Sequence, residues 1–328
     1  MFDFAATCWF ITGPTAGGKT STGVELARRL GAEIVSLDSM AVYRGMDLGT
    51  AKPTVAEQAA AVHHLLDLVD PSDEYSVARY LLDAEQAVQS IQARGKQVLF
   101  VGGTPLYLKA LLRGIFAGPP ADWSFRESLQ EFARTAGKAA LHARLAGVDP
   151  AAAARLHVED ERRVIRALEV FEKTGRPISA WQAQFERGRP AAECRVFVLA
   201  WPRAELHARI ERRVDEMFSA GLVDEVRAWL AGGGSYGRTA SQAVGYREVL
   251  EHLRGERNLP ATIALVKLRT RQFAKRQDTW FRSLSECHPL AIHERFAPAQ
   301  VAERIMLAGQ DADEEIAPKG AGFPPARE

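Results

Sequence analysis

The segment Gly13-Pro14-Thr15-Ala16-Gly17-Gly18-Lys19-Thr20 constrains this chain more than any other, because it fits the pattern GxxxxGK[ST]. In such a loop the backbone N–H groups surround phosphate oxygens, the lysine adds a positive charge, and the threonine hydroxyl is placed for Mg²⁺. An apolar run precedes the segment and a helical pattern follows it, which a glycine-rich turn without function does not require. The pattern therefore predicts a phosphate-binding loop between a strand and a helix.

Short apolar runs and helical stretches alternate through the first half of the chain. The runs lie at residues 7–12, 33–37, 97–101 and 195–200. Buried strands that alternate with helices are typical of parallel sheets. We therefore predict an α/β fold, a P-loop NTPase-like parallel sheet flanked by helices. Helices are expected at 20–30 and 77–93 between the first runs, and later at 203–219, 222–231, 241–254 and 260–283.

Residues 117–192 contain no strand signal. Gly118-Pro119-Pro120 opens this stretch, Gly188-Arg189-Pro190 closes it, and helical patterns at 124–145 and 161–173 lie between. We read it as an all-helical insertion domain in a core made of residues 1–116 and 193–309. The acidic, proline-containing residues 310–328 are expected to be disordered.

Composition limits the cellular environments and the kinds of ligand that we expect for this chain. It has no run of 18 or more apolar residues, which argues against a membrane span. Its three cysteines lie far apart, at Cys8, Cys194 and Cys287, which suits a reducing cytoplasm and gives no zinc pattern. Residues 114–310 hold 30 Lys/Arg against 24 Asp/Glu, so a polyanion is more favoured there than elsewhere.

The position of the carboxylates does not fit an ordinary NTPase. NTPases usually hold Mg²⁺ with an Asp after a strand, but the third apolar run here continues as Gly102-Gly103-Thr104. The second run ends at Asp38, which would project into the same crevice as the loop. Asp38 either acts there or only caps the following turn, and the residues alone favour neither.

Several further motifs make a family resemblance visible. They are Asp38-Ser39-Met40-Ala41-Val42-Tyr43-Arg44-Gly45-Met46-Asp47-Leu48-Gly49-Thr50-Ala51-Lys52-Pro53, His63-His64-Leu65-Leu66-Asp67, Gly102-Gly103-Thr104-Pro105-Leu106-Tyr107, Val244-Gly245-Tyr246-Arg247 and Lys275-Arg276-Gln277-Asp278-Thr279-Trp280. With the loop, they closely resemble the bacterial tRNA dimethylallyltransferases (IPP transferase family) over residues 7–285. The resemblance implies transfer of the dimethylallyl group of dimethylallyl diphosphate to the N6 amine of the adenosine on the 3′ side of the tRNA anticodon.

The resemblance also implies roles for particular residues. The loop Gly13–Thr20 would hold the departing diphosphate, with Lys19, Thr20 and a Thr20-bound Mg²⁺ neutralising its charge. Asp38 would be the general base for the attacking amine, and Arg213 would reach the diphosphate. Without the family, Arg213 is one charge on a solvated helix face.

The family further implies contact with the tRNA anticodon stem-loop, from which the target base must be extruded. Taken alone, each basic cluster is more often a solvated face, and Trp280 and Phe281 either stack on bases or anchor their helix. The residues that match the family's RNA contacts are Asp38, Ser39, Met40, Ala41, Thr104, Arg126, Arg162, Arg163, Val164, Ile165, Arg166, Gln242, Ala243, Val244, Gly245, Tyr246, Arg247, Lys275, Arg276, Gln277, Asp278, Thr279, Trp280, Phe281 and Arg282.

Three other functions compete with this one. A P-loop kinase of a small molecule or nucleotide would share the loop, but it gives no role to the basic C-terminal helix. An RNA-binding module with a vestigial loop does not need an intact Lys19 and Thr20, and an enzyme that prenylates free adenine nucleotides does not need the insertion. His63, His64 and Asp67 lack a further ligand at metal-binding spacing. We expect a monomer.

Overall fold

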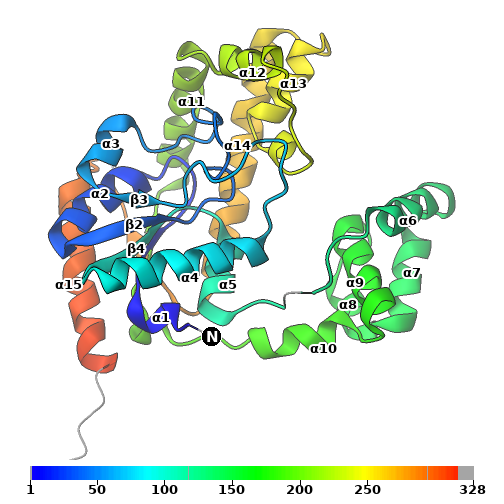
Figure 1. The fold of residues 1–328 in the computed structure, drawn as a ribbon, viewed down its shortest axis with the longest axis horizontal. Helices are drawn as coiled ribbons and strands as arrows, with labels where there is room; N and C mark the ends of the chain where they lie inside the picture. The colour runs from blue at the N-terminus through cyan, green and yellow to red at the C-terminus, as the bar shows by residue number, and fades with distance from the viewer. Residues whose placement is uncertain (1, 117, 294, 317–328) are drawn as a thin grey trace, which may run out of the picture. The chain divides into compact units, whose positions relative to one another are not determined.

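Within the described residues, six parallel strands form one sheet in the order β3-β2-β4-β1-β5-β6, and Figure 1 labels β2, β3 and β4 of this sheet. The structure is a computed structural model that describes residues 2–116, 118–293 and 295–316. The α/β fold predicted from the sequence is confirmed. The strands are β1 (Trp9–Thr12), β2 (Ala32–Ser36), β3 (His63–His64), β4 (Gln97–Val101), β5 (Val196–Ala200) and β6 (Cys287–Ala291).

The two edge strands were not predicted. β3 has two residues, which is too short for a periodic signal. β6 reads Cys-His-Pro-Leu-Ala, and its Pro289 is tolerated because the strand pairs only with β5. Neither strand shows the apolar run that identifies a central strand.

Alternate residues of the central strands face two separate cores, as the two-residue period of a strand requires. Phe10, Val35 and Phe100 lie in one core, and Ile11, Ile34 and Leu99 lie in the other. The first core is covered by α4 (Val77–Ala93), α5 (Pro105–Arg113), α12 (Leu222–Ala231) and α13 (Tyr246–Leu253). The second core is covered by α2 (Lys19–Leu30) and α15 (Pro298–Ile316). The carboxyl ends of the strands are left to loops, and these loops carry the site.

The chain divides into two compact units, residues Met1–Leu112 with Gly188–Glu328 and residues Arg113–Arg187. In the first unit α4, α11 and α12 have the bounds given by the sequence pattern. The helices of this unit are α1 (Phe4–Thr7), α2 (Lys19–Leu30), α3 (Val55–Ala60), α4 (Val77–Ala93), α5 (Pro105–Arg113), η2 (Ala191–Glu193), α11 (Arg203–Ser219), α12 (Leu222–Ala231), η3 (Ala240–Gln242), α13 (Tyr246–Leu253), α14 (Leu259–Arg282) and α15 (Pro298–Ile316).

The second unit is all helical within its described residues and has its own core, which includes Leu129, Leu145 and Val164. The helical pattern at 124–145 is interrupted in the structure. Gly137 adopts φ +88° between two helices, a backbone conformation that suits glycine. The helices are α6 (Trp123–Ala136), α7 (Lys138–Val148), α8 (Pro150–Arg155), α9 (Glu161–Thr174), α10 (Ile178–Gln182) and η1 (Ala183–Phe185).

α15 continues to Ile316 and so extends into the stretch 310–328, for which the sequence predicts disorder. Residues 317–328 lie outside the described part of the chain. None of the described helices is both long and apolar enough to cross a membrane.

Candidate active site

The loop Gly13–Gly18 joins β1 to α2, and its glycines are required by its shape. Gly13 has φ +137°, and a Cβ there would lie 2.9 Å from the carbonyl oxygen of Leu199. Gly18 has φ +82° immediately before the helix. Even Ala16 takes the left-handed conformation, with φ +60°. Within the loop the N–H of Gly17 donates to Pro14 O (3.2 Å). The turn leads into the N-terminus of α2, where backbone N–H groups favour an anion.

Three side chains from distant parts of the chain support this loop. Trp201 Nε1 donates to Gly17 O (2.9 Å), Arg209 Nε donates to Ala16 O (2.8 Å), and the Thr15 N–H donates to Gln277 Oε1 (2.9 Å). Sequence reasoning missed Trp201 and Arg209 altogether. Trp201 follows directly after β5, so its place at the carboxyl end of a strand was the available signal.

Lys19 and Arg213 form the positive pole of the site. Lys19 Nζ donates to Pro14 O (2.8 Å) and lies against Gly103, where a Cβ would be 3.3 Å from the ammonium nitrogen. Burial and the charge of Arg213 lower the pKa of Lys19 to about 7, and burial also lowers the pKa of Arg213. Among the described residues neither cation is ion-paired with a carboxylate. The pole is therefore left for an anionic ligand to neutralise.

Asp38 follows β2 and caps the following turn, which is one of the two roles that the sequence left open. Its Oδ1 accepts hydrogen bonds from Met40 N (2.8 Å) and Ala41 N (3.4 Å), so it caps the turn. Burial raises the pKa of Asp38, while these N–H groups and the charge of Lys19 act in the opposite direction. Within the described residues no group donates to Oδ2. One carboxylate oxygen therefore holds the turn and the other is available to accept a proton.

The turn after Asp38 packs against the segment after β4. Thr104 Oγ1 accepts the N–H of Ser39 (3.0 Å), and the Thr104 N–H donates to Leu37 O (3.1 Å). A Cβ on Gly102 would lie 2.2 Å from the carbonyl oxygen of Leu37, so the close approach requires glycine. Asp38, Ser39 and Thr104 are thereby brought together.

Thr20 fits the predicted Mg²⁺ contact. It is the second residue of α2 and half-buried, and its hydroxyl makes no hydrogen bond to any described residue. The described residues contain no cluster of three or more His, Cys, Asp or Glu that could hold a metal. A magnesium ion here would take the hydroxyl together with phosphate oxygens and water, which is usual for this ion.

The histidine motif is engaged in other contacts. His64 Nε2 lies 2.6 Å from Glu33 Oε2, and Asp67 Oδ1 accepts from Lys52 Nζ (2.5 Å). These pairings agree with the expectation that the motif is not a metal site.

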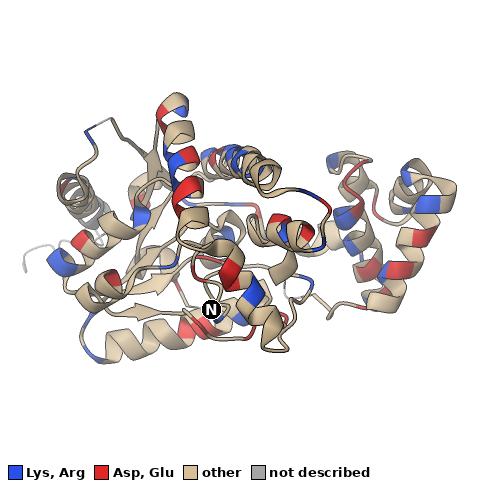
Figure 2. Ribbon diagram, turned by 90° about the horizontal axis from the view of Figure 1, so that it is seen from above, with Lys and Arg blue, Asp and Glu red and all other residues tan. Residues whose placement is uncertain are grey.

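The candidate RNA residues of the first unit divide into exposed and buried sets. Lys275, Arg276, Thr279 and Arg282 are exposed on α14, as are Gln242 and Arg247 near the start of α13, and Ser39, Met40, Thr104, Val244, Asp278 and Trp280 are partly buried. Lys267 and Arg271, on the same helix, are paired with Asp215 and Glu211. Arg282 Nη2 lies 2.8 Å from Asp278 Oδ2 on the same helix. Figure 2 shows basic and acidic residues interspersed along the helices.

The buried set includes candidates from both units, and several of its side chains make contacts inside the protein. Gln277 holds Thr15 and Gly103 O (2.6 Å), and Phe281 anchors α14 in the core. Tyr246 donates to Glu225 Oε1 (2.5 Å) beneath α12. These residues lie on the inner faces of their helices or turns: Ala41, Val164, Ile165, Ala243, Gly245, Tyr246, Gln277 and Phe281.

In the second unit the candidate arginines differ in their pairing. Arg162 and Arg163 are exposed at the start of α9, and Arg163 Nη1 lies 3.3 Å from Asp160 Oδ2. Arg126 and Arg166 both bind the buried carboxylate of Glu169, and Arg126 Nε lies 2.8 Å from Glu169 Oε1. Arg126 and Arg166 are about a quarter to a third exposed, so they keep an outer surface.

Comparison with known proteins shows the same combination of core and insertion elsewhere. The family model "IPP transferase" matches residues 41–284. A tRNA dimethylallyltransferase of Rhodopirellula baltica is 51% identical over 293 residues, which cover 87% of each chain. The chain belongs to the IPP transferase family.

Solved structures of IPP transferase family members have the same fold. The tRNA isopentenylpyrophosphate transferase of Bacillus halodurans superposes with a TM-score of 0.69 at 37% identity, covering 94% of this chain and 98% of that one. A eukaryotic dimethylallyltransferase described as acting on tRNA gives a TM-score of 0.77 at 25% identity, covering 98% of this chain and 82% of that one.

Proposed function

We propose that this chain transfers the dimethylallyl group of dimethylallyl diphosphate to the N6 amine of the adenosine 3′-adjacent to the anticodon in tRNA, releasing diphosphate. The observation that carries the proposal is the position of Asp38 beside a phosphate loop with an unpaired positive pole. A carboxylate there lies where a nucleophile would lose its proton, and the loop lies where the leaving group would gain charge.

The leaving group is the demanding part of this reaction. An allylic diphosphate departs when the negative charge that develops on its bridging oxygen is stabilised. The loop N–H groups, Lys19 and Arg213 provide donors that are already oriented, and such preorganised donors act most strongly in the transition state. A bound Mg²⁺, held through Thr20, would supply additional charge neutralisation to the diphosphate.

The nucleophile is the exocyclic amine of an adenine, which is weak. As the new C–N bond forms, the C–O bond to diphosphate breaks and the nitrogen becomes acidic. Asp38 Oδ2 accepts that proton, and Oδ1 remains bound to Met40 N. The raised pKa of Asp38 brings its basicity closer to that needed for proton transfer near neutral pH.

The RNA surface is proposed to include exposed cations of both units. On the first unit these are Lys275, Arg276, Arg282 and Arg247, and on the second they are Arg162 and Arg163. Their charges would meet phosphates of the anticodon stem-loop, because phosphate contacts provide most of the affinity and position the substrate. The target base would be extruded toward Asp38 and Thr104.

A small-molecule kinase is the second candidate. It is disfavoured because β4 continues as Gly102 and Gly103, and both glycines are required by close packing rather than replaced by a carboxylate. A kinase also assigns no function to the Asp38 turn.

The test is to incubate the protein, Mg²⁺ and ATP with radiolabelled dimethylallyl diphosphate and either unmodified tRNA or AMP. We expect label to appear in tRNA and not in AMP. Hydrolysis or transfer of ATP phosphate without prenyl transfer would support the kinase and overturn the proposal. Asp38→Asn should keep donor and tRNA binding and lower the single-turnover rate by about 10²–10⁴-fold.

A further inference from the structure

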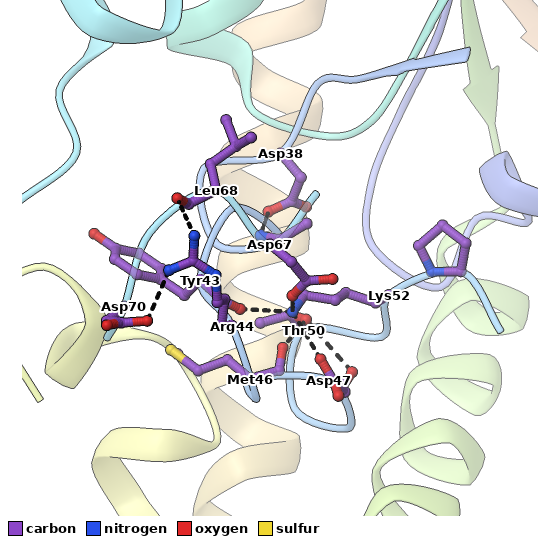
Figure 3. Close-up of polar contacts among 12 residues, drawn as sticks. Asp38, Tyr43, Arg44, Met46, Asp47, Thr50, Lys52, Asp67, Leu68 and Asp70 are labelled. Atoms are coloured by element: carbon purple, nitrogen blue, oxygen red, sulfur yellow. Dashed lines mark hydrogen bonds and ion pairs between the residues drawn. The ribbon is translucent and has the colours of Figure 1, made fainter. Parts of the chain in front are cut away.

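The loop that carries Asp38 encloses a buried ammonium group. The side chain of Lys52 is 4% exposed. Its Nζ donates to Tyr43 O (2.6 Å), Asp47 Oδ1 (2.7 Å) and Asp67 Oδ1 (2.5 Å), as Figure 3 shows. A lysine ammonium has three N–H donors, and all three are used here. A buried cation is tolerated only when it is satisfied in this way.

The three acceptors come from different turns of the chain. Tyr43 and Asp47 belong to the stretch that follows Asp38, and Asp67 lies after β3. The backbone at two points around this ammonium is strained, since Ala51 has φ +52° and Asp67 has φ +54°. The left-handed conformation persists for non-glycine residues when surrounding contacts determine it. The bonds of Lys52 are contacts of this kind.

Asp67 connects the ammonium to the Asp38 turn. Its backbone N–H donates to Ala41 O (3.2 Å), and the Ala41 N–H is one of the two that bind Asp38 Oδ1 (3.4 Å). Arg44 adds two hydrogen bonds to the segment that follows β3, because it donates to Leu68 O (2.8 Å) and Asp70 Oδ1 (2.8 Å). Hydrogen bonds therefore link Lys52 to Asp38 by way of Asp67 and Ala41.

We propose that Lys52 is a positioning residue of the prenyl transfer: its ammonium fastens the turn from Asp38 to Asp47 onto Asp67, and this fixes the direction of the Asp38 carboxylate. The inference rests on the proposed function, in which Asp38 is the base. Lys52 touches neither substrate, since its donors are all occupied by Tyr43, Asp47 and Asp67. Its charge also favours the ionised form of Asp38.

An apolar side chain of similar length cannot replace the ammonium. Without the ammonium, the carboxylates of Asp47 and Asp67 lie close together with no counterion between them, and like charges repel. The turn would then open and Asp38 would move. Displacement of a reacting group by about 1 Å costs on the order of 10²-fold in rate.

The test compares Lys52→Met, Lys52→Arg and Asp67→Asn with the wild type in single-turnover prenyl transfer at saturating tRNA and dimethylallyl diphosphate. The Kd of each substrate and the melting temperature are measured in parallel. Arg94→Met is the matched control, because Arg94 pairs with Glu33 (2.6 Å) at the opposite end of β2.

We expect Lys52→Met to lower the transfer rate by about 10–100-fold with the donor Kd unchanged. Lys52→Arg should recover much of the loss, because a guanidinium also offers several donors. Asp67→Asn, which removes one charge and keeps an acceptor, should lose less than Lys52→Met, and Arg94→Met should keep the wild-type rate.

A wild-type rate in Lys52→Met would overturn the inference. So would equal loss of rate, donor binding and melting temperature without rescue by Lys52→Arg, since that is the behaviour of a merely structural residue. If Lys52→Met does not fold, an Asp67→Asn variant at the full wild-type rate has the same meaning. Failure of the wild type itself to prenylate tRNA would instead contradict the proposed function.

Discussion

Two clusters of cations in this protein differ in whether a carboxylate of the protein pairs with them. In the helical unit, the buried carboxylate of Glu169 accepts from Arg126 (2.8 Å), Arg166 and the N–H of Asp122 (2.7 Å). Burial would raise the pKa of Glu169, but these hydrogen bonds outweigh it and the pKa is lowered. At the phosphate loop, Lys19 and Arg213 have no carboxylate partner among the described residues.

The difference separates charges that hold the fold from charges kept for a ligand. In the Glu169 cluster a carboxylate of the protein balances the arginine charges, and the bond from Arg126 to Glu169 joins α6 to α9. The Lys19 pole is held together against repulsion and desolvation, which is costly for the free protein. Such a cost is tolerated where an anion binds, and it makes the two clusters distinguishable by mutation.

The largest expected effect is the loss of activity when Lys19 is replaced, because no carboxylate among the described residues pairs with its charge. Lys19→Met should lower kcat/KM by about 10²–10³-fold, because one preorganised donor to the leaving group is lost. The melting temperature should not fall, since no ion pair is broken. Steady-state prenyl transfer and thermal unfolding check this. A large loss of stability with little loss of rate would place Lys19 with the structural charges.

The reverse pattern is expected at the balanced cluster. Glu169→Gln should lower the unfolding free energy of the helical unit by about 1–3 kcal/mol, since partly buried arginine donors lose their charged acceptor. Urea unfolding followed by hydrogen exchange in Arg113–Arg187 measures it. Glu131→Gln is the control, because Glu131 pairs with Arg134 on an exposed surface and should change stability by less than about 0.5 kcal/mol. Equal effects of the two variants would contradict the comparison.

A smaller effect concerns pH. Burial raises the pKa of Asp38, and the base must be ionised to accept a proton. Activity should therefore fall as pH is lowered through this raised pKa, which lies above the value of about 3.9 for an exposed aspartate. Single-turnover rates across the acidic range, with a stability check at each pH, test whether the pKa of the base is raised or lowered. An acidic limb at or below the value for an exposed aspartate would mean that the nearby N–H groups and Lys19 dominate.

The smallest effect is expected at the exposed cations of α14. Replacing Lys275 and Arg276 by alanine should reduce the slope of log Kd for tRNA against log salt by about 1.4, if each residue meets one phosphate of a single-stranded segment. Lys96→Ala, a change at another exposed lysine, should leave the slope unchanged. An unchanged slope in the double variant would move the RNA path away from α14.

The sequence predicted the parts of this protein that have local signatures. The phosphate loop, the four central strands, and helices such as α4 and α11 each follow from a contiguous pattern of glycines or apolar residues. Asp38 was found because it ends a strand. These features need no knowledge of the rest of the fold.

The remaining features depend on contacts that no local pattern records. Trp201, Arg209 and Lys52 acquire their positions from distant partners, and the two edge strands pair without an apolar run. The RNA candidates were read as contiguous segments, although a helix turns every third or fourth residue inward. For that reason Gln277 and Phe281 were grouped with the exposed Lys275.

The hydrogen bond from Thr15 to Gln277 joins residues that are 262 positions apart. Because a ribosome synthesises a chain from its N-terminus, the loop at Gly13–Gly18 leaves the ribosome before the side chains that support it have been added. Trp201 and Arg209 follow after β5, and Gln277 arrives last, on α14. A nascent chain thus has the complete glycine pattern long before it has a supported diphosphate site, and the site is assembled only once α14 has been translated.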